Sequence, residues 1–153
     1  VTSRDIRVER WDLTPLQSAL NAGLLPVIYG DVIFDEARGG TILSTEDLFT
    51  HLARQLKPNR ILLAGLEAGV WEDFPARTRL IDGISLQSYE AMRAGIGAST
   101  SVDVTGGMAA KVGQMFELIR DVPGLTAQIF SAEEAGNLAH ALAGKRVGTE
   151  LRA

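Results

Sequence analysis

The chain contains no cysteine and only two histidines, His51 and His140, among its 153 residues. Without cysteine it can form neither a disulfide framework nor a thiolate nucleophile or thiolate metal site. Each histidine stands alone in a helical pattern, far from the other in the sequence. We therefore expect no metal cluster built from these residue types.

Long apolar runs are also absent. No run approaches the roughly 20 residues that a helix needs to cross a bilayer, and the N-terminus lacks a signal-peptide pattern. The net charge of −4, with no basic face, argues against broad nucleic-acid binding. Hydrophobic residues make up 46% of the chain and charged residues 22%, as in an ordinary soluble protein with a real core. These features predict a cytoplasmic protein with neither a nucleic-acid nor a membrane partner.

Buried strands and amphipathic helices are expected to alternate along the chain. Apolar runs at residues 24–29, 61–64 and 126–130 predict strands covered on both faces. Helical spacing occurs at residues 45–56, after the capping-box sequence Ser44-Thr45-Glu46-Asp47, and at residues 86–93, 108–119 and 133–143. This alternation predicts an α/β fold with a three-layer αβα arrangement, in which helices cover both faces of a largely parallel sheet.

Two hairpins are expected before the first long helix. Residues 1–10 alternate apolar and charged side chains and predict an exposed strand or hairpin arm. Residues 32–34 and 41–43 flank a second turn, where we expect Asp35 and Glu36 at a solvated tip.

Three loops are expected at the carboxyl ends of strands, where α/β sheets bind their ligands. The first contains Gly30 and Asp31, the second runs from Gly65 to Gly69, and the third covers residues 105–111.

The third loop has the composition of a phosphate cradle. Its sequence is Asp103-Val104-Thr105-Gly106-Gly107-Met108-Ala109-Ala110-Lys111. The glycines let the backbone approach a ligand, and the first amides of the helix lack intrahelical acceptors. An anion is favoured there, and Lys111 adds a positive charge about one turn later. The same residues also fit a plain turn followed by a solvated lysine, and the pattern alone does not decide between the two.

With these loops the sequence resembles the amino acid kinase superfamily, and within it the isopentenyl phosphate kinases. The matching segments follow in the family's order across residues 12–151: Gly23-Leu24-Leu25-Pro26-Val27-Ile28-Tyr29-Gly30-Asp31-Val32, Ile42-Leu43-Ser44-Thr45-Glu46-Asp47, Leu56-Lys57-Pro58-Asn59-Arg60, residues 103–111, Gly136-Asn137-Leu138, and Gly148-Thr149.

The resemblance implies an amino acid kinase-like fold and an ATP-dependent kinase that uses Mg²⁺. It implies phosphoryl transfer from ATP to a small phosphate monoester, isopentenyl phosphate, giving the diphosphate. It further implies that acceptor binding involves Gly30 and Asp31, and that ATP is bound by Gly65, Leu66, Thr105, Gly106, Gly107 and Lys111. No residue of this chain is assigned as a catalytic group.

The resemblance also implies the domain organisation. Residues 1–43 would end an N-terminal acceptor-binding lobe, and residues 44–153 would form the C-terminal nucleotide-binding lobe. The family's Lys-x-Gly-Gly-Ser strand and Gly-Gly-Gly-x-x-Gly-His loop do not occur here, so most of the N-terminal lobe is missing and belongs to the same or another chain. We therefore expect the fragment alone to be inactive. The family further implies a homodimer.

One segment departs from the family's pattern. Isopentenyl phosphate kinases carry Thr-Asp-Val-Asp-Gly-Val-Tyr where this chain has Gly65-Leu66-Glu67-Ala68-Gly69-Val70-Trp71. Both aspartates are replaced by apolar residues, and Glu67 supplies a carboxylate at a shifted position. Two alternatives therefore stay open: a kinase of the superfamily with another acceptor (fosfomycin, carbamate, uridylate or an acylated amino acid), and a non-catalytic nucleotide-binding regulatory module.

Overall fold

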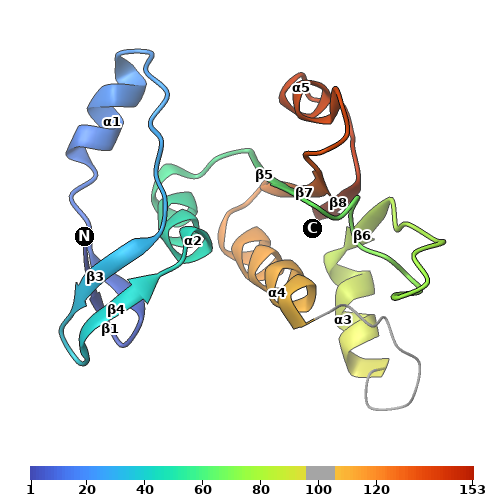
Figure 1. Ribbon diagram of the computed structural model, residues 1–153, viewed down its shortest axis with the longest axis horizontal. Helices are drawn as coiled ribbons and strands as arrows, with labels where there is room; N and C mark the ends of the chain where they lie inside the picture. Colours follow the sequence, from blue (N-terminus) through green and yellow to red (C-terminus); the bar gives the residue numbers. More distant parts are fainter. Residues whose placement is uncertain (96–105) are drawn as a thin grey trace. The chain divides into compact units, whose positions relative to one another are not determined.

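The protein is described by a computed structural model that covers residues 1–95 and 106–153. It divides into two compact units, Val1–Leu56 and Lys57–Ala153. Each unit contains a four-stranded sheet with helices (Figure 1), so the predicted α/β class is confirmed. The division falls after the helix that begins at Thr45, whereas the sequence suggested a boundary between residues 43 and 44. The binding roles assigned to the two lobes stay predictions.

The first unit is built from two hairpins and two helices. Its sheet has the order β2-β1-β3-β4, with antiparallel pairs β1–β2 and β3–β4 joined by a parallel contact between β1 and β3. The predicted hairpin arm and second hairpin are therefore confirmed. The elements are β1 (Thr2–Arg4), β2 (Arg7–Arg10), α1 (Thr14–Asn21), β3 (Asp31–Asp35), β4 (Gly39–Leu43) and α2 (Thr45–Leu56).

The capping box that opens α2 is present. The amide of Asp47 donates to Ser44 Oγ over 3.1 Å, and the amide of Ser44 donates to Asp47 Oδ2 over 3.2 Å. Two amides at the helix start are thus satisfied by side chains. Helical spacing then buries Leu48, Leu52 and Ala53 on one face of α2.

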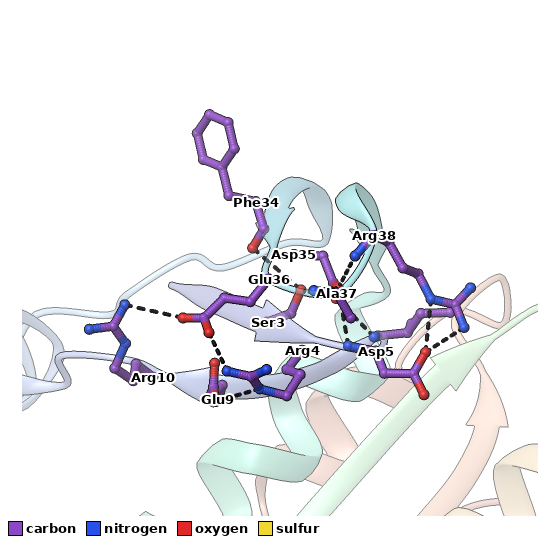
Figure 2. Close-up of polar contacts among 11 residues, drawn as sticks. Ser3, Arg4, Asp5, Glu9, Arg10, Phe34, Asp35, Glu36, Ala37 and Arg38 are labelled. Carbon is purple, nitrogen blue, oxygen red and sulfur yellow. Dashed lines mark hydrogen bonds and ion pairs between the residues drawn. The ribbon is translucent and has the colours of Figure 1, made fainter.

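A buried carboxylate joins the two hairpins of this unit. Asp35 is only 3% exposed, so the expectation of a solvated tip was wrong for this residue. Its oxygens accept hydrogen bonds from the hydroxyl of Ser3 and from four backbone amides (Figure 2), those of Asp5, Ile6, Ala37 and Arg38. Burial raises the pKa of Asp35, but these hydrogen bonds outweigh burial and hold the pKa well below an aspartate's usual value.

The first turn depends on this carboxylate. Asp5 and Ile6 have φ values of 48° and 65°, the left-handed region that a two-residue hairpin turn requires and that a β-branched residue rarely adopts. Asp35 accepts hydrogen bonds from both of their amides, at 3.1 and 3.0 Å. The carboxylate therefore stabilises a turn whose own residues disfavour it.

The predicted strand at residues 24–29 is not formed. This segment has no regular secondary structure, and Leu25 and Val27 are 89% and 83% exposed. A strand needs a neighbour that satisfies its backbone groups, and no strand within the described residues pairs with this segment. The large apolar side chains of this segment are therefore mostly exposed in this structure.

The second unit carries a sheet of order β5-β7-β8-β6. The pairs β5–β7 and β6–β8 are parallel and β7–β8 is antiparallel, so the expected parallel arrangement holds for two of its three pairings. Figure 1 draws α5 on one side of this sheet and α3 and α4 on the other, the predicted αβα layering. The elements are β5 (Arg60–Gly65), β6 (Gly83–Ser85), α3 (Leu86–Gly95), α4 (Gly106–Asp121), β7 (Thr126–Ser131), α5 (Asn137–Leu142) and β8 (Thr149–Arg152).

The core of this unit forms between α4 and the sheet. The apolar face predicted for α4 is buried at Val112, Met115, Phe116 and Ile119, and Phe116 stacks on Tyr89 of α3 with ring centroids 4.3 Å apart. Strand β7 is buried from Ala127 to Ser131, whereas β5, at the edge of the sheet, is only partly buried. None of the described helices is both long and apolar enough to span a membrane.

We expect Asp35→Asn to destabilise the first unit more than Glu36→Gln. An amide has one acceptor oxygen and places a donor against backbone donors, whereas the Glu36 carboxylate forms exposed ion pairs with Arg4 and Arg10. Urea unfolding followed by the fluorescence of Trp11, which stacks on His51 in this unit, measures the difference. Equal midpoints for the two variants would contradict the role given to Asp35.

The same carboxylate predicts an acid dependence. Because the folded-state pKa of Asp35 lies below the unfolded value of about 3.9, its contribution is complete above that pH and is lost as the pH falls towards the folded-state pKa. The free energy of unfolding of the first unit should therefore decrease below about pH 4. In Asp35→Asn this decrease should be smaller; an unchanged pH profile would refute the assignment.

Candidate functional site

The carboxyl ends of β5 and β7 lie next to each other. Gly65, the last residue of β5, pairs with Ser131, the last residue of β7, and its carbonyl accepts a 2.8 Å hydrogen bond from the amide of Ala132. The loops that leave these strands therefore start side by side. The loop after β7 was not among the three candidates from the sequence, although Gly136 and Asn137 before an apolar helix could have indicated it.

The loop after β7 is fixed by its own polar groups. Asn137 Nδ2 donates to the carbonyl of Ser131 over 3.1 Å, and the amide of Glu133 donates to Ser131 Oγ. Gly136 has a φ of 90° directly before α5. The turn needed at this glycine explains why α5 begins at Asn137 and not near residue 133 as predicted.

Helix α4 begins at the same edge of the sheet. It precedes β7, which runs parallel to β5, so its C-terminal end faces the start of β7 and its N-terminal end faces the carboxyl edge. Gly106 and Gly107 are its first residues, and a Cβ added at Gly107 would meet no described atom within 4 Å. Lys111 lies one turn further, on the same face of the helix as Gly107, with an exposed side chain. Thr105 lies outside the described residues.

The loop after β5 is anchored by a buried threonine. Thr149 of β8 is fully buried; its Oγ1 accepts a 2.8 Å hydrogen bond from the amide of Val70 and donates to the carbonyl of Ile81 over 2.6 Å. A Cβ at Gly69 would lie 2.5 Å from this hydroxyl, so only glycine fits there. Both ends of the excursion between residues 70 and 81 are thereby tied to one side chain.

Gly148, the residue before Thr149, is also needed for this contact. Its φ is 60°, and a Cβ would lie 2.1 Å from the carbonyl oxygen of Ile129 and 2.6 Å from that of Ala68. The Gly148-Thr149 pair thus sets the position of the loop that contains Leu66 and Glu67.

Glu67 forms a polar network at the tip of this loop. Its Oε2 accepts a hydrogen bond from Trp71 Nε1 over 3.1 Å, and its Oε1 lies 2.8 Å from a guanidinium nitrogen of Arg77. The guanidinium carbon of Arg77 is 5.3 Å from the centre of the Phe74 ring. Leu66 beside it is 76% exposed, an unusual exposure for leucine.

Asp73 holds the outer part of the excursion. Its carboxylate accepts hydrogen bonds from the hydroxyl and amide of Thr78 and from the amide of Arg79. The Thr78 hydroxyl contributes most to lowering the pKa of Asp73 below its ordinary value. This carboxylate therefore stabilises the excursion.

The acceptor-side candidates belong to the first unit. A Cβ at Gly30 would lie 2.3 Å from the carbonyl oxygen of Leu43, and the amide of Gly30 donates to Thr45 Oγ1 over 3.0 Å. Close packing against the backbone at the start of α2 thus requires glycine here. Asp31, the first residue of β3, is exposed. Acceptor binding by these two residues stays a prediction.

Within residues 1–95 and 106–153, no group of three or more histidine, aspartate or glutamate residues is placed to hold a metal ion.

A model of the amino acid kinase family matches residues 1–131. The chain belongs to the amino acid kinase family. The predicted family and the amino acid kinase-like fold are thus confirmed.

Relatives of this family member are isopentenyl phosphate kinases. It is 32% identical over 152 residues to the enzyme of Methanothermobacter thermautotrophicus, covering 95% of the chain and 55% of that protein. It is 35% identical over 140 residues to the enzyme of Haloferax volcanii, covering 92% of the chain and 51% of that protein. A crystal structure of isopentenyl phosphate kinase superposes with a TM-score of 0.75 at 27% identity, covering 98% of the chain and 55% of that structure. The chain spans about half the length of the curated relatives it matches.

We expect Thr149→Val to destabilise the second unit by about 1–3 kcal/mol, because the buried amide of Val70 loses its acceptor. Thr149→Ser keeps the hydroxyl and should lose only about 1 kcal/mol for the missing methyl group. Chemical unfolding of the two variants measures the difference. If serine and valine destabilised equally, the hydroxyl would not be the anchor.

Proposed function

We propose that this amino acid kinase family member forms the nucleotide-binding part of an ATP-dependent kinase that transfers a phosphoryl group to isopentenyl phosphate. The observation that carries the proposal is the start of α4, where Gly106, Gly107 and Lys111 lie at the carboxyl edge of the sheet. The similarity to isopentenyl phosphate kinases over nearly the whole chain supports this acceptor.

The chemistry asks for positioning and charge neutralisation more than for a covalent nucleophile. We propose that the first amides of α4 bind the ATP phosphates and that Lys111 adds its positive charge to them. Among the described residues no atom lies within 4 Å of a Cβ placed at Gly107, which supports this role, because a phosphate could approach the backbone there. Gly65 and Leu66, at the end of β5, would contact the nucleoside part of ATP. Mg²⁺ would enter with ATP, since it is usually held by substrate phosphates and few protein oxygens.

The acceptor would bind in the first unit, near Gly30 and Asp31. We propose that the complete enzyme has a further lobe, in the same or another chain, that covers residues 24–29. The exposure of Leu25 and Val27 supports this, as does the length of the relatives. Cytoplasmic location and a homodimer stay predictions from the composition and the resemblance.

A non-catalytic nucleotide-binding module is the second candidate. Its support is the loop after β5, where Leu66 and Ala68 stand in place of the family's two aspartates. Binding of ATP without turnover of any phosphate monoester by the complete protein would favour this module. Turnover of fosfomycin, carbamate, uridylate or an acylated amino acid, without turnover of isopentenyl phosphate, would favour another acceptor within the family.

We expect Lys111→Ala to weaken ATP binding by about tenfold. This is the lower end of the range for the loss of one charge-assisted hydrogen bond, and we take the lower end because the Lys111 side chain is exposed. Calorimetric titration of the complete protein with Mg²⁺ and ATP measures the change. Lys145→Ala removes an exposed lysine after α5 and should leave the affinity unchanged.

The wild-type protein provides a further check. A ligand that binds only the native state must raise its unfolding temperature. If millimolar ATP with Mg²⁺ gave no thermal shift, both nucleotide-binding candidates would be wrong. If ATP bound equally to the wild type and Lys111→Ala, only the role of Lys111 would fail.

A further inference from the structure

We propose that Glu67 binds the ribose hydroxyls of the nucleotide and thereby orients it in the site. This inference rests on the proposed function, since it assigns one part of the ATP molecule to one carboxylate. Residues 65–71 are the segment in which the chain departs from the family's pattern, and Glu67 stands there at a position where the pattern has valine.

The position of Glu67 in the fold supports this role. Glu67 is the second residue after β5, at the carboxyl edge where Gly65 pairs with Ser131. Helix α4 begins at this edge too. A nucleotide whose phosphates bind at the start of α4 therefore has its nucleoside part available for the loop after β5.

The Glu67 carboxylate retains capacity for further hydrogen bonds. A carboxylate has about four acceptor sites, and the contacts with Trp71 Nε1 and Arg77 involve one on each oxygen. The Glu67 side chain is 35% exposed, so a ligand can reach it. Two neighbouring hydroxyl groups can donate to one carboxylate, as the ribose of a bound dinucleotide does in other α/β folds.

The Glu67 carboxylate is already oriented before a ligand binds. Trp71 and Arg77 contact different oxygens of Glu67, and Arg77 in turn lies over the Phe74 ring. The base of the loop is held by the Thr149 hydroxyl. Little side-chain entropy is therefore lost when a ligand binds, which favours affinity.

The charges around Glu67 also favour ribose over phosphate at this position. Because Glu67 is paired with Arg77, the two side chains together carry little net charge, which suits the neutral ribose better than a phosphate. Lys111 attracts phosphates at the start of α4. Glu67 and Lys111 thus define the direction of the bound nucleotide, with the exposed Leu66 offering apolar surface beside the ribose position.

The experiment compares ATP with 2′-deoxy-ATP, both with Mg²⁺, on the complete protein. The chain has two tryptophans, Trp11 and Trp71, and Trp11→Phe removes the first of them. The indole N–H of the remaining Trp71 donates to Glu67. We expect ATP to change the fluorescence of Trp71 and to bind about tenfold more tightly than 2′-deoxy-ATP, the value of one charge-assisted hydrogen bond. Inorganic tripolyphosphate should bind without this fluorescence change.

Glu67→Gln keeps the size of the side chain and removes its charge. We expect the preference for ATP to fall to about threefold or less, because a neutral acceptor is weaker. Glu72→Gln is the matched control: Glu72 lies in the same excursion but pairs with Arg79, so the tenfold preference should persist.

The outcomes separate this inference from the proposed function. Equal affinity of the wild type for ATP and 2′-deoxy-ATP, or an unchanged preference in Glu67→Gln, would overturn the role of Glu67 while nucleotide binding stands. No calorimetric binding of ATP by the wild type would overturn both. The wild-type comparison needs no variant, so the test holds even if Glu67→Gln folds poorly.

Discussion

The loop that follows β5 in the candidate site depends on one hydroxyl group, that of Thr149. It is buried between the two ends of the excursion at residues 70–81, accepts from the amide of Val70 and donates to the carbonyl of Ile81. Gly69 and Gly148 lack the Cβ atoms that would keep the backbone from closing around it. The position of Glu67, and with it the whole network at the tip of the loop, follows from this contact. A strand on the far side of β7 thus determines the loop that leaves β5.

The first unit uses the same principle with a carboxylate. Asp35 accepts from four amides of two turns and from the Ser3 hydroxyl of β1, and Asp5 and Ile6 adopt backbone conformations that their side chains disfavour. In both units a buried polar group, fully supplied with partners, joins segments far apart in the sequence. Such groups contribute specificity because an incomplete set of partners leaves donors buried without acceptors.

The sequence was informative where structure is local. The capping box at Ser44, the apolar face of α4 and both hairpins follow from residues within one or two turns of each other, and all are present. The resemblance to the amino acid kinase family, confirmed by the family match, rests on ordered motifs and needs no contact information.

What depends on distant partners could not be predicted. The burial of Asp35 requires Ser3 and the turn at Asp5, more than 25 residues earlier. The antiparallel direction of β8 depends on how the chain returns after α5, which apolar periodicity does not encode. The network of Glu67 with Arg77 crosses an irregular excursion, where no repeating pattern indicates which side chains meet. Part of the predicted phosphate loop, including Thr105, lies outside the described residues.

The unpaired run at residues 24–29 has a consequence for handling the protein. Leu24, Leu25, Val27 and Tyr29 are exposed on a segment whose backbone groups no described strand satisfies, and such segments add to the free edges of other molecules' sheets. Pro26 lacks an amide hydrogen and so interrupts any ladder built on this run. Pro26 therefore limits intermolecular strand pairing at this exposed apolar run.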